Sequence, residues 1–152
     1  MYHRILVPLD GSATAQRGFH EALTLARSLD ASLVLVHVVE WFPMVAEMTT
    51  ATSWDQVTGG LREAGRELLD RAHDQARELG VAAEAHLLES GAARVADTIV
   101  DQAREHQCDL IVMGTHGRRG LTHALVGSDA EAVLRLSPVP VLMVRHAEAA
   151  SG

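Results

Sequence analysis

The sequence predicts a single-domain α/β protein built on an open parallel sheet, and three observations support this. Short apolar segments rich in β-branched residues alternate with longer amphipathic segments along the chain. Strands separated by helices form βαβ units, whose right-handed crossovers produce a parallel sheet. A length of 152 residues, of which 47% are hydrophobic, suffices for one core but not for two ordinary ones.

The first elements are a strand, a helix and a second strand. Residues 5–7 are apolar and are followed by Pro8, which indicates a short buried strand. Residues 12–29 carry apolar side chains at helical spacing. The continuous apolar run 32–39 is typical of a strand covered on both faces. Residues 41–56 show no clear period and are expected to form a mobile surface loop, with room for a short helical turn.

The middle of the chain repeats this alternation. Residues 57–79 are periodic over a long helix that Gly80 is expected to end. Residues 81–88 read as a third strand, 92–106 as a helix, and 109–113 as a fourth buried strand.

The C-terminal part completes the predicted domain. A short helix over 129–136 precedes a last strand over 139–144, which is entered through two prolines. The domain is expected to span residues 1–146, and the Ala, Ser and Gly residues of 147–152 are expected to be a frayed tail.

The composition narrows the classes of function. A net charge of −7 with no Arg-rich stripe argues against nucleic acid as a partner. The chain contains no lysine, which excludes a Walker A loop and Schiff-base chemistry. Neither a signal peptide nor a run of 18 apolar residues is present, so we expect a cytoplasmic protein without a membrane partner.

A glycine motif follows the fourth predicted strand. Gly114 and Gly117 are three residues apart, and Gly127-Ser128 follow after nine intervening residues, which gives the spacing G-x2-G-x9-G-[ST]. Glycines between a strand and a helix let backbone N–H groups approach an anion closely. The alternatives are that Gly114 and Gly117 are ordinary turn residues, and that Ser128 with Glu131 forms a capping box without any ligand.

The sequence resembles the ATP-binding branch of the universal stress protein family. The likeness rests on MYHRILVPLDGS, LVLVHVVE, CDLIVMGTHGRRGL and VGSDAEAVLRLSPVPVLMVR, in the family's order and at its usual separations. It covers residues 2–146. The resemblance implies a Rossmann-like, five-stranded parallel sheet in the order 3-2-1-4-5 with helices on both faces, and a homodimer formed through the last strand, 139–144. The alternative for that strand is an edge blunted by its prolines.

The resemblance also assigns roles to residues of the glycine motif. It implies that Gly117, Gly127 and Ser128 hold the phosphates of ATP. Met113 and Gly114 are then expected to line the nucleoside. AMP and ADP are alternative ligands, and Mg²⁺ is expected to be held mainly by the phosphates.

Three further residues belong to the implied site. The backbone of Val38 is expected to read the adenine edge, and Asp10 to contact the ribose or lie near a phosphate-bound metal. Without a ligand, Asp10 reads as a turn or N-cap residue. Asp129 stands where the family also has apolar or small residues, and its carboxylate either stabilises the helix start or opposes the phosphates.

Three functions remain open. The favoured one is a non-catalytic sensor that binds an adenine nucleotide. The alternatives are a homodimeric interaction module that binds no nucleotide, and a slow ATPase, since the sequence shows no evident catalytic pair. Among weaker signals, His37 reads as a satisfied core or edge histidine, and His106 with Cys108 is too little for zinc.

Overall fold

The computed structural model describes residues 1–40, 50–115 and 126–145. The predicted loop residues 41–49, Gly117 and the predicted tail lie outside the described residues. The elements are β1 (Arg4–Pro8), α1 (Ala13–Leu29), β2 (Ser32–Val39), α3 (Ala51–Glu78), β3 (Ala83–Glu89), α4 (Val95–Glu105), β4 (Leu110–Gly114), α5 (Ser128–Leu136) and β5 (Val141–Val144).

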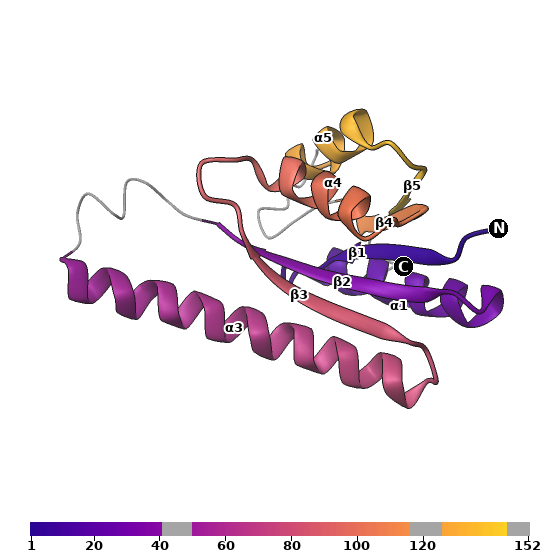
Figure 1. Ribbon diagram of the computed structural model, residues 1–152, viewed down its shortest axis with the longest axis horizontal. Helices are drawn as coiled ribbons and strands as arrows, with labels where there is room; N and C mark the ends of the chain where they lie inside the picture. Colours follow the sequence, from indigo (N-terminus) through magenta and orange to yellow (C-terminus); the bar gives the residue numbers. More distant parts are fainter. Residues whose placement is uncertain (41–49, 116–125, 146–152) are drawn as a thin grey trace, which may run out of the picture.

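The five strands form one parallel sheet in the order β3-β2-β1-β4-β5, which confirms the predicted fold (Figure 1). β1 lies between β2 and β4, with Leu6 opposite Val34 on one side and Ile111 on the other. Strands in this position contact helices on both faces, which explains why all three side chains are fully buried.

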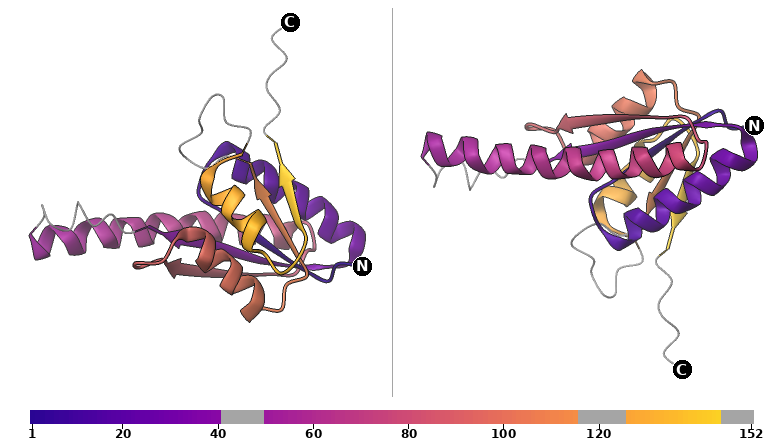
Figure 2. Two further views of the ribbon diagram at one scale, coloured as in Figure 1. Left: turned by 90° about the horizontal axis from the view of Figure 1, so that it is seen from above. Right: turned by 90° about the horizontal axis from the view of Figure 1, so that it is seen from below.

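Helices cover both faces of the sheet (Figure 2). α1 and α3 pack on one face, over a core that contains Phe19, Leu69 and alternate strand residues such as Leu35. α4 and α5 pack on the other, over a core that contains Ile99 and Val133. Burial of a side chain as large as Phe19 contributes about 2–3 kcal/mol. The low aromatic content is therefore offset by two extended layers of aliphatic side chains.

Helix α3 is longer than the sequence predicts. It begins at Ala51, so the loop prediction for residues 51–56 is wrong. The side chain of Thr50 caps the helix by accepting a hydrogen bond from the backbone N–H of Ser53. The first turns extend past the end of the sheet (Figure 1), where an amphipathic period is not needed because there is little core to face.

No helix in the described ranges 1–40, 50–115 and 126–145 combines the length and the apolar character needed to cross a bilayer.

The buried thiol of Cys108 gives a first expected result. Cys108 lies just before β4 and is only 5% exposed, and burial raises its pKa to about 11. Because the thiolate is the reactive form, we expect negligible labelling by a thiol reagent at pH 8 in the native protein, and complete labelling in denaturant. The extent of labelling is measured with a disulfide reagent that releases a coloured thiol, by the absorbance of that product. Rapid labelling of the native protein would contradict the burial of Cys108.

Candidate nucleotide site and family

The carboxyl ends of the parallel strands lie along one edge of the sheet, where ligands of open α/β sheets bind. At this edge β1 leads into α1, β2 runs past the end of β1, and β4 ends beside the start of α5. The topology therefore brings four of the implied site residues to one edge of the sheet: Asp10, Val38, Gly114 and Gly127.

Asp10 forms a turn between β1 and α1. Its Oδ1 accepts the backbone N–H of Ser12 at 2.8 Å, and Gly11 between them has φ +83°. Ser12, not Asp10, is the N-cap of α1, because its hydroxyl accepts the N–H of Ala15. The turn role proposed for Asp10 is thus correct and the N-cap role is wrong.

Val38 lies past the last described pair between β1 and β2. That pair is Pro8–Val36, and the N–H of Leu9 still donates to the carbonyl of Val36. Because the hydrogen-bonding direction alternates along a strand, the N–H and C=O of Val38 are also directed to the β1 side. The edge implied for adenine recognition is therefore turned toward the space beyond the end of β1.

His37 fixes the end of β1, a role that the sequence does not reveal. The residue is 7% exposed, and its Nδ1 lies 2.7 Å from the carbonyl oxygen of Leu9. A carbonyl can only accept, so Nδ1 carries the proton and donates. The prediction that His37 is a satisfied core histidine is confirmed. Its partner Leu9 lies 28 residues away in sequence, so no local sequence pattern predicts this hydrogen bond.

Gly114 is the last residue of β4 and lies directly against the start of α1. A Cβ at this position would lie 2.5 Å from the carbonyl carbon of Thr14 and 2.9 Å from the nitrogen of Ala15. Gly18, one turn later on α1, faces the backbone of Met113 and Gly114 at 3.1–3.2 Å from its own virtual Cβ. Close helix–strand packing, rather than a turn, is the structural reason for glycine at 114.

Thr115 joins the two ends of the glycine motif. It is 3% exposed, its N–H donates to the carbonyl of Val144, and its carbonyl accepts the N–H of Gly127. Residues 116–125 between these ends lie outside the described residues, and they include Gly117. The backbone of Gly127 is thereby held beside the end of β4.

Helix α5 begins without a side-chain cap. Gly127 is the N-cap and Ser128 the first helical residue, so the capping box predicted for Ser128 and Glu131 is wrong. Ser128 is exposed, and its hydroxyl lies at the end of the helix where backbone N–H groups have no intrahelical acceptor. This end of α5 therefore offers backbone N–H donors to an anion.

The electrostatics of this edge come mainly from helix ends. α1, α4 and α5 all begin there, so their positive dipole ends face the same edge. The first turn of α1 carries no acidic residue, whereas that of α5 carries Asp129 and Glu131. The charge of Asp129 opposes anion binding at the start of α5. The start of α1 carries no acidic side chain in its first turn, so it opposes an anion less.

Comparison with known proteins shows the family. The family model described as "Universal stress protein family" matches residues 1–145. A curated universal stress protein of Methanocaldococcus jannaschii is 35% identical over 145 residues, which cover 95% of this chain and 83% of that protein. One of Bacillus subtilis is 30% identical over 151 residues, covering 95% of this chain and 100% of its own.

Solved structures agree. A member of the universal stress protein family from Burkholderia pseudomallei is 38% identical, with a TM-score of 0.77 over 94% of this chain and 96% of its own. A universal stress protein from Archaeoglobus fulgidus in complex with dAMP is 27% identical, with a TM-score of 0.64 over 94% and 98%. One in complex with cAMP is 26% identical, with a TM-score of 0.65 over 95% and 97%. The chain therefore belongs to the universal stress protein family.

Proposed function

We propose that this protein binds an adenine nucleotide at the carboxyl edge of its sheet and acts as a regulator rather than as an efficient enzyme. The observation that carries the proposal is the backbone of Val38, whose N–H and C=O are directed beyond the end of β1. An adenine base presents a matching donor and acceptor on its own edge. The complexes of related proteins with dAMP and cAMP support the same ligand class.

The other proposed site residues contact different parts of the nucleotide. Met113 and Gly114, at the end of β4, line the nucleoside, and Asp10 accepts a ribose hydroxyl or lies near a phosphate-bound Mg²⁺. Gly117, Gly127 and Ser128 hold the phosphates, with the start of α5 supplying a favourable dipole. ATP with Mg²⁺ is the proposed ligand, because the metal offsets the charge of Asp129.

A sensor role follows from what the site contains. The described residues of this edge offer backbone N–H groups, hydroxyls and the carboxylates of Asp10, Asp129 and Glu131, but we identify no base placed beside a nucleophile among them. Binding without turnover lets nucleotide occupancy, rather than hydrolysis, set the state of the protein. At most a slow ATPase activity accompanies it.

Calorimetric titration of nucleotide-stripped protein with MgATP, and separately with AMP, tests the proposal. We expect one ATP per chain with a micromolar Kd. Ser128→Ala removes one hydroxyl donor to a charged phosphate and is expected to weaken ATP binding about tenfold. Ser28→Ala, on the exposed side of α1, is the matched control and leaves the Kd unchanged. Absence of heat and of thermal stabilisation at millimolar ATP would refute the proposal.

The second candidate function is a homodimeric interaction module, and the edge strand β5 favours assembly. Pro140 and Val144 direct their carbonyls to β4, so the alternation places the N–H and C=O of Val141 and Met143 on the outer edge. The missing N–H group of Pro140 falls on the inner side, where its carbonyl accepts from Ile111. Pro140 therefore removes no donor from the outer edge of β5.

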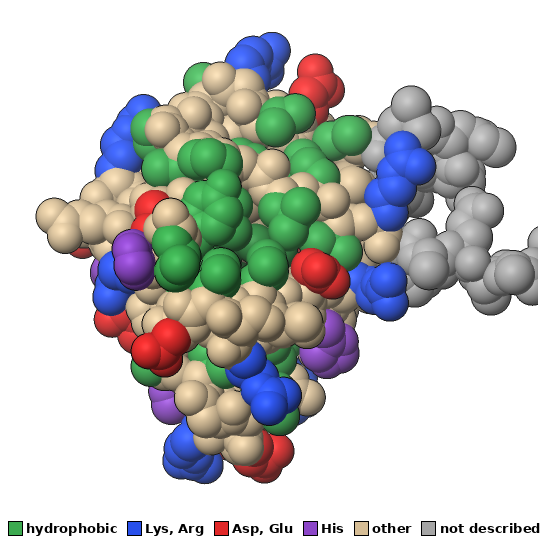
Figure 3. All heavy atoms as spheres, turned by 90° about the vertical axis from the view of Figure 1, so that its right-hand side faces the viewer, with side chains coloured by type: hydrophobic (Ala, Val, Ile, Leu, Met, Phe, Trp, Pro, Cys, Tyr) green, Lys and Arg blue, Asp and Glu red, His purple; other side chains and the backbone are tan. Residues whose placement is uncertain are grey.

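Side chains near this edge are apolar. Leu142 is 37% exposed, and Val139, Val141, Met143 and Val144 are only partly buried. Figure 3 shows a group of hydrophobic side chains on the side of the molecule toward which β5 lies in Figure 1. We propose that two chains pair through β5, which is compatible with nucleotide binding at the carboxyl edge.

A further inference from the structure

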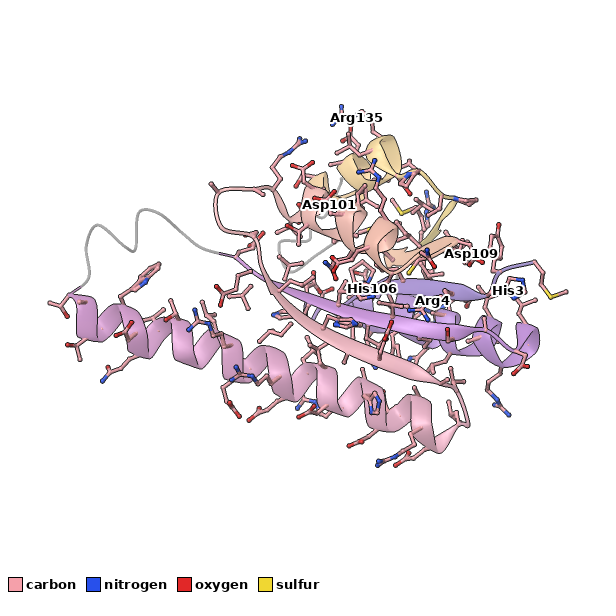
Figure 4. All side chains as sticks on the ribbon, in the orientation of Figure 1. His3, Arg4, Asp101, His106, Asp109 and Arg135 are labelled. Carbon is pink, nitrogen blue, oxygen red and sulfur yellow. The ribbon has the colours of Figure 1, made fainter. Side chains whose placement is uncertain are left out.

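A cluster of metal-ligating side chains lies at the amino end of the sheet, away from the proposed nucleotide site. Glu84 and His86 are two residues apart in β3 and point to the face that α4 covers. His106 is the C-cap of α4, at the end opposite to the start of that helix. We call these three residues the β3–α4 cluster. Figure 4 shows His106 beside Arg4, whose Nε donates to the His106 carbonyl.

The spacing of the cluster is close to that of a metal site. Nδ1 of His106 lies 3.6 Å from Oε1 of Glu84, and Nε2 of His86 lies 3.9 Å from Oε2 of Glu84. One ligand atom from each of the three residues falls within 4.8 Å of the other two. In a tetrahedral zinc site, bonds of about 2.0–2.1 Å place the ligand atoms roughly 3.4 Å apart. Small movements would bring these atoms to that separation.

The hydrogen bonds around His106 fix which nitrogen can bind a metal. Nε2 of Gln102 donates to Glu105 at 2.9 Å, so the Gln102 Oε1 is left to accept from Nε2 of His106 at 3.0 Å. Nε2 of His106 therefore donates to Gln102, and Nδ1 is the nitrogen that faces the Glu84 carboxylate. Nδ1 is therefore the nitrogen of His106 that is available to a metal beside Glu84.

His86 supplies an independent observation. Its Nε2 is fully enclosed, and it has no hydrogen-bond partner among the residues that the structure describes. A buried nitrogen without a partner costs stability unless an ion or another group satisfies it. The rings of His86 and His106 stack with centroids 4.3 Å apart, and a nitrogen of each lies within 4 Å of a Glu84 carboxylate oxygen.

We propose that the β3–α4 cluster binds a divalent first-row transition metal, with Zn²⁺ as the best fit. Two imidazoles and one carboxylate match the ligands that Zn²⁺ takes, and water fills the fourth position. Gln102 orients His106, and Arg4 contacts Oε1 of Glu84, the carboxylate oxygen that also faces Nδ1 of His106, so both ligands have outer-shell partners as in metal sites. The ring of His86, whose Nε2 has no hydrogen bond to lose among the described residues, is expected to rotate about χ2, a broad torsion, to bring its lone pair to the metal.

The proposed metal would join two elements, β3 and the end of α4. Glu84 and His86 belong to the edge strand β3, His106 to the end of α4, and Arg4 links both to β1. The side chains of Glu84, His86 and His106 are 44%, 33% and 19% exposed, so the ion can enter from solvent. Metal binding is therefore expected to stabilise the native state without contacting the nucleotide edge.

Thermal unfolding of metal-stripped, tag-free protein with added ZnCl₂ tests this proposal, together with absorption of the Co²⁺ form. We expect Zn²⁺ at about one hundred times its Kd to raise the Tm by roughly 5–10 °C, and Co²⁺ to show visible bands of a four-coordinate site. Glu84→Gln and His86→Ala are expected to abolish both signals. His20→Ala, on the exposed face of α1, is the matched control and keeps them.

Three outcomes would overturn the proposal. Wild type with neither signal would mean that the β3–α4 cluster binds no metal. Equal signals in wild type and His86→Ala would place the metal elsewhere. If Glu84→Gln lowered the Tm by the same amount in ZnCl₂ and in EDTA, Glu84 would contribute to stability only as an ordinary ion pair and not as a metal ligand. Far-UV circular dichroism verifies that each variant is folded, and ATP titration of each shows whether the nucleotide edge is intact.

Discussion

Replacing Gly114 with alanine is expected to destabilise the protein by about 3 kcal/mol, which lowers the Tm by roughly 10 °C. The added methyl would lie 2.5 Å from the carbonyl carbon of Thr14 and 2.6 Å from its oxygen. Both are backbone atoms at the start of α1, so no side-chain rotation can relieve the overlap. The helix must move away from β4, which opens the packing on both sides of Gly18.

A matched glycine separates packing from backbone effects. Gly60 lies on the exposed side of α3, and an added Cβ meets no atom within 4 Å. Gly60→Ala is therefore expected to stabilise the protein by about 0.5–1 kcal/mol, since alanine favours a helix interior over glycine. Urea unfolding of both variants measures the difference. If Gly114→Ala were as stable as wild type, α1 would not approach β4 as closely as described.

Replacing Val141 with proline is expected to convert the proposed homodimer into a monomer. The N–H of Val141 is directed to the outer edge of β5, and proline removes this donor and places its ring there. The hydrogen bonds to β4 use the alternate residues, so the fold within one chain is expected to persist. Light scattering at micromolar concentration gives the mass of each variant.

Leu142→Ser is the matched control for this variant. It removes exposed apolar surface at the same edge but keeps every backbone donor, so we expect weaker association rather than its loss. A wild-type protein that is monomeric at micromolar concentration would contradict pairing through β5. A dimeric Val141→Pro variant would show that the chains associate through another surface.

The order and nature of the elements could be predicted from the sequence because strands and helices here have distinct periods. The run 32–39 is buried almost throughout, as its continuous apolar character indicates. The start of α3 could not be predicted from periodicity, because the turn after Thr50 lies beyond the sheet and has no face to bury. The Thr50 side chain, a standard N-cap residue, was the available signal.

The candidate sites were predictable only where they are local in sequence. The Gly127-Ser128 helix start and the Asp10 turn could be located from a few neighbouring residues. The partners of His37 and His106 could not, because each contact joins segments that the fold brings together from distant positions. In the sequence, no other zinc ligand stands at a recognisable spacing from His106. The fold alone places Glu84 and His86 of β3 beside it.

The two edges of the sheet differ, and this difference limits how far assembly can grow. The β5 edge is apolar, whereas β3 carries Glu84, His86 and Glu89, and Glu89 is paired with Arg62 of α3. Pairing of β5 with β5 is isologous: each copy offers the same strand, and a two-fold axis closes the contact. Continued growth would require β3 to accept a new strand, and charged side chains disfavour that. Association would therefore stop at a two-fold symmetric dimer, in which two five-stranded sheets pair, rather than continue into a fibre.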